Sequence, residues 1–286
     1  MEYSSSGRTG SVTKMLMLAA RRSCIGGCIV AGLLTATAVA GEMEPAQNLT
    51  VEQIVEKNVA AHGGLEAWRR VQTIVWIGHI ETGSPAASTV RFVDEWKRPN
   101  KMRSEITVAH ERMTRVFNGA VGWKVGSSDT GAPALRRYTR SELRSARDAQ
   151  GIEGLLIDHR ARGIEVALDG IDQIEGHRTY RLNVTLPSGA RRRVWVDAQT
   201  FLEFKSEREP NPARGRLAPA PVYYRSYQQV DGLLVPRTIE TEPHGTTAIR
   251  TMVIDEVTVN LSLSDAHFER PDVSRRDRTP LIWAQD

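Results

Sequence analysis

The stretch from Thr179 to Lys205 reads TYRLNVTLPSGARRRVWVDAQTFLEFK, and it decides the fold class. Apolar side chains alternate with polar ones over Tyr180–Leu186, which is the period of a half-buried β-strand. Two turn-forming segments, Pro187–Gly189 and Asp197–Thr200, join this run to two further runs of β-branched and aromatic residues. Three consecutive strands joined by short turns predict an antiparallel meander.

The same strand signature recurs along the rest of the chain. Further runs bounded by turn residues fall at 89–96, 102–108, 222–229, 233–240 and 248–259. Helical segments do not alternate with these strands, which argues against a parallel Rossmann-type sheet. A sheet of so many strands must twist and curl. The predicted fold class is therefore α+β, with a strongly curved antiparallel β-sheet (an open half-barrel) and helices covering the concave face.

Two helical segments are available to cover that face. Thr50 and Gln53 have the spacing of a capping box at the start of a helix over 50–61, and Gly63 is a stop signal after it. The second segment, 141–158, is polar at first and apolar from Gly151 onward. We expect its apolar part to be a helical lid with glycines that permit movement; the alternative is a fixed core helix.

The N-terminal residues 15–40 have the tripartite pattern of a secretory signal. Arg21 and Arg22 precede an uncharged, apolar run that ends in Ala38-Val39-Ala40. We predict cleavage after Ala40, a periplasmic location, and a single domain over 41–286; the alternative is an uncleaved N-terminal anchor. Lipid anchoring at Cys28 is disfavoured, because most of the apolar run follows this cysteine rather than preceding it.

Composition excludes several function classes for the exported part of the chain. Both cysteines, Cys24 and Cys28, precede residue 41, so disulfides and thiolate chemistry are not expected after the signal. Residues 1–40 hold four basic and one acidic side chains, which leaves 34 basic against 33 acidic in the remainder. This near-neutral balance gives no reason to expect nucleic-acid binding.

No catalytic constellation is recognisable in the sequence. A G-x-S-x-G elbow and a P-loop are absent, and His110-Glu111 is not followed by the second histidine of a zincin motif. The acidic pairs Asp94-Glu95 and Asp255-Glu256 lie in predicted strands, where neighbouring side chains point to opposite faces. We therefore expect no catalytic residues, no metal site and no cofactor; an enzyme with scattered catalytic residues is the weakest alternative.

Large apolar side chains at sheet positions and in the lid are the candidate ligand-binding residues. A curved sheet too wide to be filled by its own side chains leaves an apolar cavity. The candidates are Trp76, Phe92, Trp96, Met102, Phe117, Trp123, Leu155, Leu156, Ile157 and Trp195. Each of them is alternatively an ordinary core residue.

Six segments, taken in order, resemble a known family. They are His62–Trp68, Arg98–Arg103, Phe117–Trp123, Asp197–Glu203, Val230–Pro236 and Asp265–Pro271. In this order they look like the periplasmic LolA/LolB-like proteins, often described as outer-membrane lipoprotein-sorting proteins. The resemblance covers about residues 48–271 and implies a half-barrel, closed by helices, that holds acyl chains or other hydrophobic ligands.

The resemblance and the export signal together predict a non-catalytic periplasmic carrier or binding protein for lipid or lipoprotein acyl chains. The expected partners are the ligand and a membrane-bound donor or acceptor protein, and the protein is expected to be a monomer. The alternative function is an envelope regulatory or structural protein that binds another protein, with residues 136–147 and the loop at 210–221 as its surface.

Overall fold

The structure is a computed structural model that describes residues 49–81, 90–109, 111–127, 133–149, 151–209, 220–242 and 249–273. The chain divides into Met1–Gln47 and a compact unit, Asn48–Asp286, and all described residues belong to the second unit. The predicted export signal and Cys28 lie outside the described residues. Within the described part, no helix is long and apolar enough to cross a membrane.

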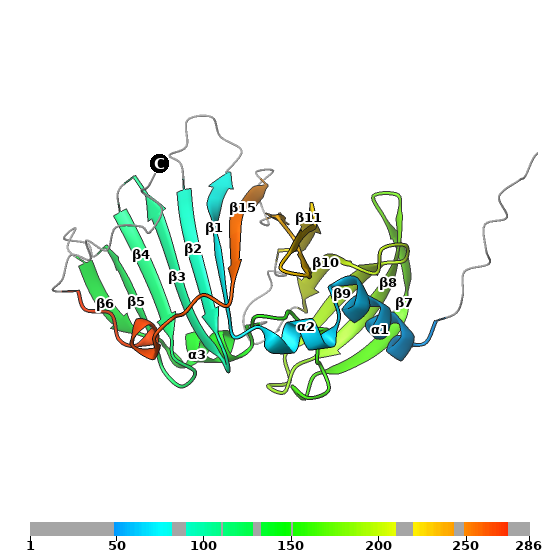
Figure 1. The fold of residues 1–286 in the computed structure, drawn as a ribbon, viewed down its shortest axis with the longest axis horizontal. Helices are drawn as coiled ribbons and strands as arrows, with labels where there is room; N and C mark the ends of the chain where they lie inside the picture. Colours follow the sequence, from blue (N-terminus) through cyan, green and yellow to red (C-terminus); the bar gives the residue numbers. More distant parts are fainter. Residues whose placement is uncertain are drawn as a thin grey trace, which may run out of the picture. The chain divides into compact units, whose positions relative to one another are not determined.

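Thirteen strands form one open antiparallel sheet (Figure 1), which confirms the predicted fold class. Its strand order is β6-β5-β4-β3-β2-β1-β15-β14-β11-β10-β9-β8-β7. The strands are β1 (Thr73–Glu81), β2 (Val90–Lys97), β3 (Lys101–Val108), β4 (Glu111–Phe117), β5 (Gly122–Ser127), β6 (Pro133–Arg137), β7 (Glu165–Ile174), β8 (His177–Thr185), β9 (Arg191–Asp197), β10 (Glu203–Arg208), β11 (Val222–Arg225), β14 (Thr238–Thr241) and β15 (Arg250–Val259). A separate hairpin pairs β12 (Gln228–Val230) with β13 (Leu233–Val235).

The sheet consists of two meanders that β14 and β15 connect. Strands β1 to β6 pair in sequence order, as do β7 to β11, and β15 pairs with β1 on one side and with β14 on the other. The predicted hairpins of Thr179–Lys205 are present as β8, β9 and β10. Within the described residues, β6 and β7 are the two edge strands and do not pair with each other, so the sheet is open.

The first helix agrees with the prediction, and the second predicted segment needs a correction. In α1 (Val51–Ala61) both hydrogen bonds of the Thr50–Gln53 capping box are present, and α2 (Leu65–Arg70) follows two glycines. The predicted lid over 141–158 is helical only in α3 (Arg140–Arg147); residues 151–163 form successive turns. Gly151 and Gly154 have φ of 66° and 73°, a left-handed conformation that an α-helix does not accommodate.

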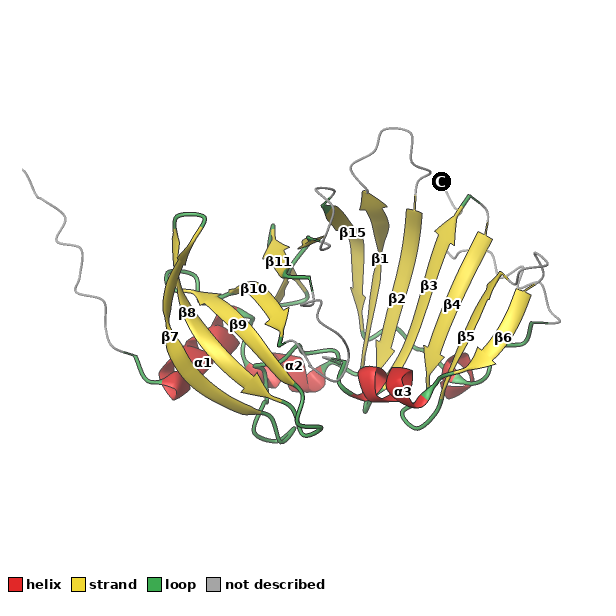
Figure 2. Cartoon of the chain, turned by 180° about the vertical axis from the view of Figure 1, so that it is seen from behind, coloured by secondary structure: helices red, strands yellow, loops and turns green. Residues whose placement is uncertain are grey.

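We call the face of the sheet against which α1, α2, α3 and the 151–163 turns pack the inner face. Three buried clusters lie on it. Ile54 of α1 packs with Leu182 and Val194 of β8 and β9, Trp68 of α2 packs with strands β1, β2 and β15, and α3 covers Phe117. In Figure 2 the helices, in red, lie toward the lower ends of the strands. This arrangement leaves the middle of the inner face for a cavity.

Candidate functional site

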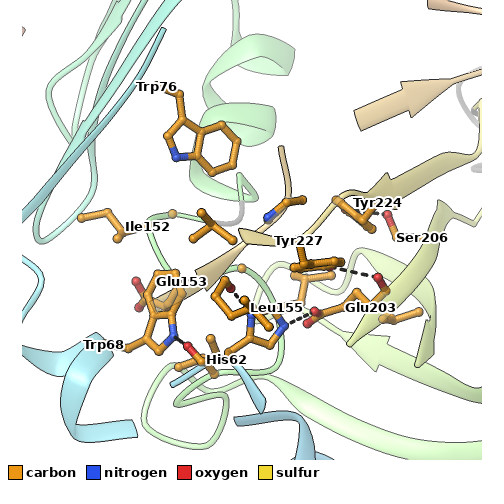
Figure 3. A pocket seen from close by; sticks show the side chains of 17 residues that line it. His62, Trp68, Trp76, Ile152, Glu153, Leu155, Glu203, Ser206, Tyr224 and Tyr227 are labelled. Carbon is orange, nitrogen blue, oxygen red and sulfur yellow. Dashed lines mark hydrogen bonds and ion pairs between the residues drawn. The ribbon is translucent and has the colours of Figure 1, made fainter. Parts of the chain in front are cut away.

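A cavity lies on the inner face between the sheet and the 151–163 turns, and it encloses about 650 Å³ of empty space, part of it open to solvent. Residues from eight segments of the chain surround it (Figure 3). They are His62, Trp68, Trp76, Gly151, Ile152, Glu153, Gly154, Leu155, Ile157, Val194, Glu203, Ser206, Tyr224, Tyr227, Leu234, Val235 and Pro236. Most of these side chains are apolar or aromatic, which is the usual character of a pocket for an organic ligand.

One ion pair lies at the cavity wall, between His62 and Glu203. The His62 ring directs Nε2 to the Glu203 carboxylate, and Nδ1 donates to the main-chain oxygen of Leu234 at 2.8 Å. His62 is only 5% exposed. With both ring nitrogens directed at acceptors, the ring is held in one orientation and has no nitrogen lone pair for a ligand.

The two partners stabilise each other's charged forms. Burial by itself would lower the pKa of His62, but the charge and hydrogen bond of Glu203 raise that pKa above the ordinary 6.5. Burial by itself would raise the pKa of Glu203, but the charge of His62 lowers that pKa below the ordinary 4.5. Both effects favour an imidazolium–carboxylate pair at neutral pH.

Aromatic side chains fix this pair in place. Trp68 Nε1 donates to the main-chain oxygen of His62 at 2.9 Å, and the Tyr227 hydroxyl donates to the main-chain oxygen of Glu203 at the same distance. The Tyr227 and His62 rings meet edge to face at 5.6 Å. The pair therefore ties the end of α1 to β10 and to the β12–β13 hairpin, and it closes one end of the cavity.

The 151–163 turns form the opposite wall, and Glu153 anchors them. Its carboxylate accepts from Arg98 Nη1 at 3.1 Å and lies 3.6 Å from Arg162 Nε, while its side chain is 8% exposed. Arg98 also donates to the main-chain oxygens of Val71 and Trp68. These ion pairs and hydrogen bonds therefore connect the 151–163 turns to the β2–β3 turn and to α2.

A second cavity lies on the other side of the same wall. It encloses about 1070 Å³ of empty space, again including open solvent, and shares Gly151, Ile152 and Glu153 with the first. Its charged lining is predominantly cationic: Lys97, Arg98, Lys101, Arg147 and Arg162 against Asp148 and Glu153. An apolar cavity and a basic one therefore flank the 151–154 turns.

The structure places the ten predicted cavity residues in three groups. Trp76, Leu155 and Ile157 line the apolar cavity, and Trp96 lines the basic one. Four others lie in the packed interior or beside it: Phe92, Met102, Phe117 and Leu156. Of these, Phe92, Phe117 and Leu156 are at most 1% exposed.

The third group, Trp123 and Trp195, lies on the outer face. Register pairs Phe117 with Gly122 and Val116 with Trp123, so Trp123 lies on the face opposite Phe117. Trp195 follows Val194 on β9 and therefore faces away from the cavity; its Nε1 donates to Asp172 at 2.7 Å and Lys205 lies over its ring. Neither residue is among those that line the two cavities.

The sequence-based candidates did not include the polar members of the site. His62 and Glu203 lie in two of the six segments that carry the family resemblance, but 141 positions separate them. Nothing in local spacing indicates that they meet. Within the described residues there is no group of three or more side chains that could hold a metal ion.

Comparison with known proteins identifies the fold. Neither a scan against family models nor a search of curated proteins gives a match. Solved structures do match: a LolA superfamily protein from Nitrosomonas europaea has a TM-score of 0.51 at 14% identity, over 77% of this chain and 98% of the other. A DUF1329 family protein from Desulfovibrio piger has a TM-score of 0.51 at 15% identity, over 77% and 97%.

A third match is a domain from Vibrio parahaemolyticus described as an outer membrane lipoprotein-sorting protein. It has a TM-score of 0.50 at 11% identity and covers 78% of this chain and 97% of the other. The fold of this chain is therefore LolA-like, as the ordered sequence segments predicted. At these identities the similarity shows the fold alone, and any ligand must be inferred from the residues of the site.

Proposed function

We propose that this protein is a non-catalytic carrier or binding protein of the periplasm for a hydrophobic ligand, such as a lipid or the acyl chains of a lipoprotein. The observation that carries the proposal is the cavity between the inner face and the 151–163 turns, whose lining is mostly apolar and aromatic. The LolA-like fold and the predicted export signal support it.

The physical basis for binding is removal of methylene groups from water. Each CH₂ buried contributes about 0.8 kcal/mol, so a chain of eight to ten methylenes gains about 6–8 kcal/mol before ordering costs. The side chains that can provide such contacts include Ile152 and Leu155 of the 151–163 turns, Leu234 of β13 and Trp76 of β1.

The first test is native mass spectrometry of protein expressed from the full chain and purified from periplasmic extract without detergent. We expect a co-purifying mass that extracts into organic solvent. After delipidation, the protein should take up a fluorescent acyl probe. A clean apo mass together with no uptake of phospholipid or acyl probe would refute the proposal.

A matched pair of variants locates the binding site. Leu234 is half-buried and lines the cavity, whereas Leu168 is 40% exposed on β7. Leu234→Trp should fill the cavity and lower acyl-probe affinity at least tenfold, and Leu168→Trp should leave it unchanged. Equal affinities in the two variants would mean that the probe binds elsewhere.

A second candidate function, binding of a protein partner, has one structural feature in its favour. Strand β6 is a free edge of the sheet, and it carries Arg136 and Arg137 next to the arginine-rich α3. An unpaired edge is a template for an added strand. Pulldown from periplasmic extract with and without charge reversal at these two arginines tests this alternative, and equal partner recovery would count against it.

A further inference from the structure

Two arginines face each other on the inner face without a carboxylate partner among the described residues. Arg192 on β9 and Arg208 on β10 are directly paired in the antiparallel register, so their side chains leave the sheet on the same side. Side chains at such positions have Cβ atoms about 5 Å apart, and like charges there repel each other. The arrangement is costly unless something negative lies between them.

Arg192 is the more unusual of the two because it is buried. Its exposed fraction is 8%, its Nη2 donates to the main-chain oxygen of Asp148 at 3.0 Å, and its Nε has no hydrogen-bond partner. Burial and then the charge of Arg208 hold the pKa of Arg192 below its ordinary value. A buried guanidinium without a directly paired carboxylate is rare, since the desolvation cost is normally offset by a paired anion.

The sequence around the pair offers no hidden acid. Residues 210–219, which follow β10, contain no Asp or Glu. Glu209 lies 3.8 Å from Arg193 on the outer face. Asp148 offers Arg192 its main-chain oxygen, and its charge offsets that of Arg192 only in part, because burial and the charge of Arg208 have larger effects on the pKa of Arg192. Within the described residues neither arginine forms a direct ion pair with a carboxylate, and the charge of Asp148 is the one partial compensation from a carboxylate for Arg192.

The arginine pair adjoins the apolar cavity. Val194 and Ser206 line the cavity, are paired with each other, and lie two residues from Arg192 and Arg208 on the same face. Two residues of strand span about 7 Å. Tyr224, another lining residue (Figure 3), interacts with Ser206 through its hydroxyl and is close enough to influence the charge of Arg192. The His62–Glu203 pair thus lines the cavity, and the two arginines lie beyond Val194 and Ser206 on β9 and β10, without a directly paired carboxylate among the described residues.

We propose that Arg192 and Arg208 bind the anionic group of an amphiphilic ligand, a carboxylate or a phosphate, whose apolar part occupies the cavity. This inference rests on the proposed function and specifies its ligand class. Guanidinium groups match carboxylate and phosphate oxygens with paired, charge-assisted hydrogen bonds. An anion between the two side chains would satisfy Arg192 Nε and remove the repulsion between the pair.

The test compares a charged and an uncharged probe of the same length, dansylundecanoic acid and its methyl ester. In delipidated wild-type protein the acid should bind at least tenfold more tightly than the ester. In Arg192→Gln and in Arg208→Gln this ratio should fall toward one while the affinity for the ester stays the same. Arg193→Gln, which removes an equal charge from the outer face of the same strand, is the control and should keep the ratio.

The outcomes separate this inference from the proposed function. Equal binding of acid and ester in the wild type, or a ratio that survives both inner-face substitutions, overturns the anion site but leaves the carrier in place. If neither probe binds, inorganic phosphate still tests the site: a rise in Tm in the wild type that Arg208→Gln abolishes supports anion binding without a tail. Arg208 is exposed, so that variant is not expected to disturb folding.

A purely structural role for Arg192 makes a different prediction. Its bond to Asp148 reaches the C-cap residue of α3, so a structural arginine would lower Tm when replaced. If Arg192 binds an anion, the cost of burying its charge is not offset while the ligand is absent. Arg192→Met should then leave the Tm of the delipidated protein unchanged or raise it. A lower Tm in this variant, with the acid-to-ester ratio retained in Arg208→Gln, would overturn the inference.

Discussion

Asp94 on β2 should make the protein less stable as the pH rises from 4 to 7. It lies on the inner face, opposite Trp76 on β1 and Ser104 on β3. Burial raises the pKa of this carboxyl from the ordinary 3.8 to about 6, against the opposing effect of the hydrogen bond from Ser104. The folded protein therefore retains a proton on Asp94 over a pH range in which the unfolded chain has lost it.

The size of the effect follows from that difference. Each pKa unit corresponds to 1.36 kcal/mol, so ionised Asp94 costs the folded state about 3 kcal/mol. Because the folded-state pKa is the higher one, the free energy of unfolding falls with pH between about 4 and 6 and is constant above that range, as far as this group is concerned. Asp94→Asn keeps the shape of the side chain and removes the charge.

The assay is urea unfolding of wild type and Asp94→Asn at intervals from pH 4 to pH 8. The variant should be about 3 kcal/mol more stable than the wild type at pH 8, with the difference shrinking to near zero at pH 4. Ser104→Ala serves as a companion variant, because loss of the hydrogen bond should move the transition to higher pH. A difference between wild type and Asp94→Asn that does not change with pH would refute the reasoning.

Three further predictions concern the His62–Glu203 pair, the Gly63 turn and the outer face of the sheet. His62→Ala leaves Glu203 buried without its counter-charge, so the free energy of unfolding measured in urea should fall by about 3–5 kcal/mol. The double variant with Glu203→Gln should recover much of that loss. If the losses of the two single variants simply add, the two side chains are not coupled. Gly63→Ala should lower the free energy of unfolding by more than about 2 kcal/mol. Gly63 has a φ of 103°, and a Cβ there would lie 2.2 Å from the main-chain oxygen of Gly232. An unchanged Tm would show that the loops holding Gly63 and Gly232 separate easily. Trp123→Phe on the outer face should leave acyl-probe affinity within about twofold, and a large loss in fluorescence titration would show that this side of the sheet also binds ligand.

Much of the fold was predictable from local patterns. The alternation in Thr179–Lys205 and the capping box at Thr50 depend on neighbouring residues only, so the sequence shows them directly. Strands β4 and β6 were not predicted, because Arg112, Arg115 and Arg136 lie on strands with little apolar alternation. Those strands form because neighbouring strands offer hydrogen-bonding edges, which is a tertiary effect.

The turns at 151–163 show a different limit. Their apolar residues fit a helix equally well by composition, and the sequence-based expectation was a helical lid. The left-handed glycines and the ion pairs of Glu153 prevent a helix there. Glu153 binds Arg98, which precedes it by 55 positions, and Arg162, which follows it by nine. Short-range propensity cannot anticipate an ion pair over such a separation.

By itself the sequence determined the strand-rich class, the first helices and the pattern of an export signal, because each depends on neighbouring residues. It also determined the LolA-like resemblance, which depends on the order of six short segments along the chain. The tertiary structure decided which face of each strand meets the cavity: Gly122 and Val194 lie on the inner face, so their neighbours Trp123 and Trp195 lie on the outer face. It also decided the charged groups of the site. His62 meets Glu203 only because the end of α1 and β10, which are distant in the sequence, pack side by side, and the register of the β9–β10 hairpin places Arg192 opposite Arg208.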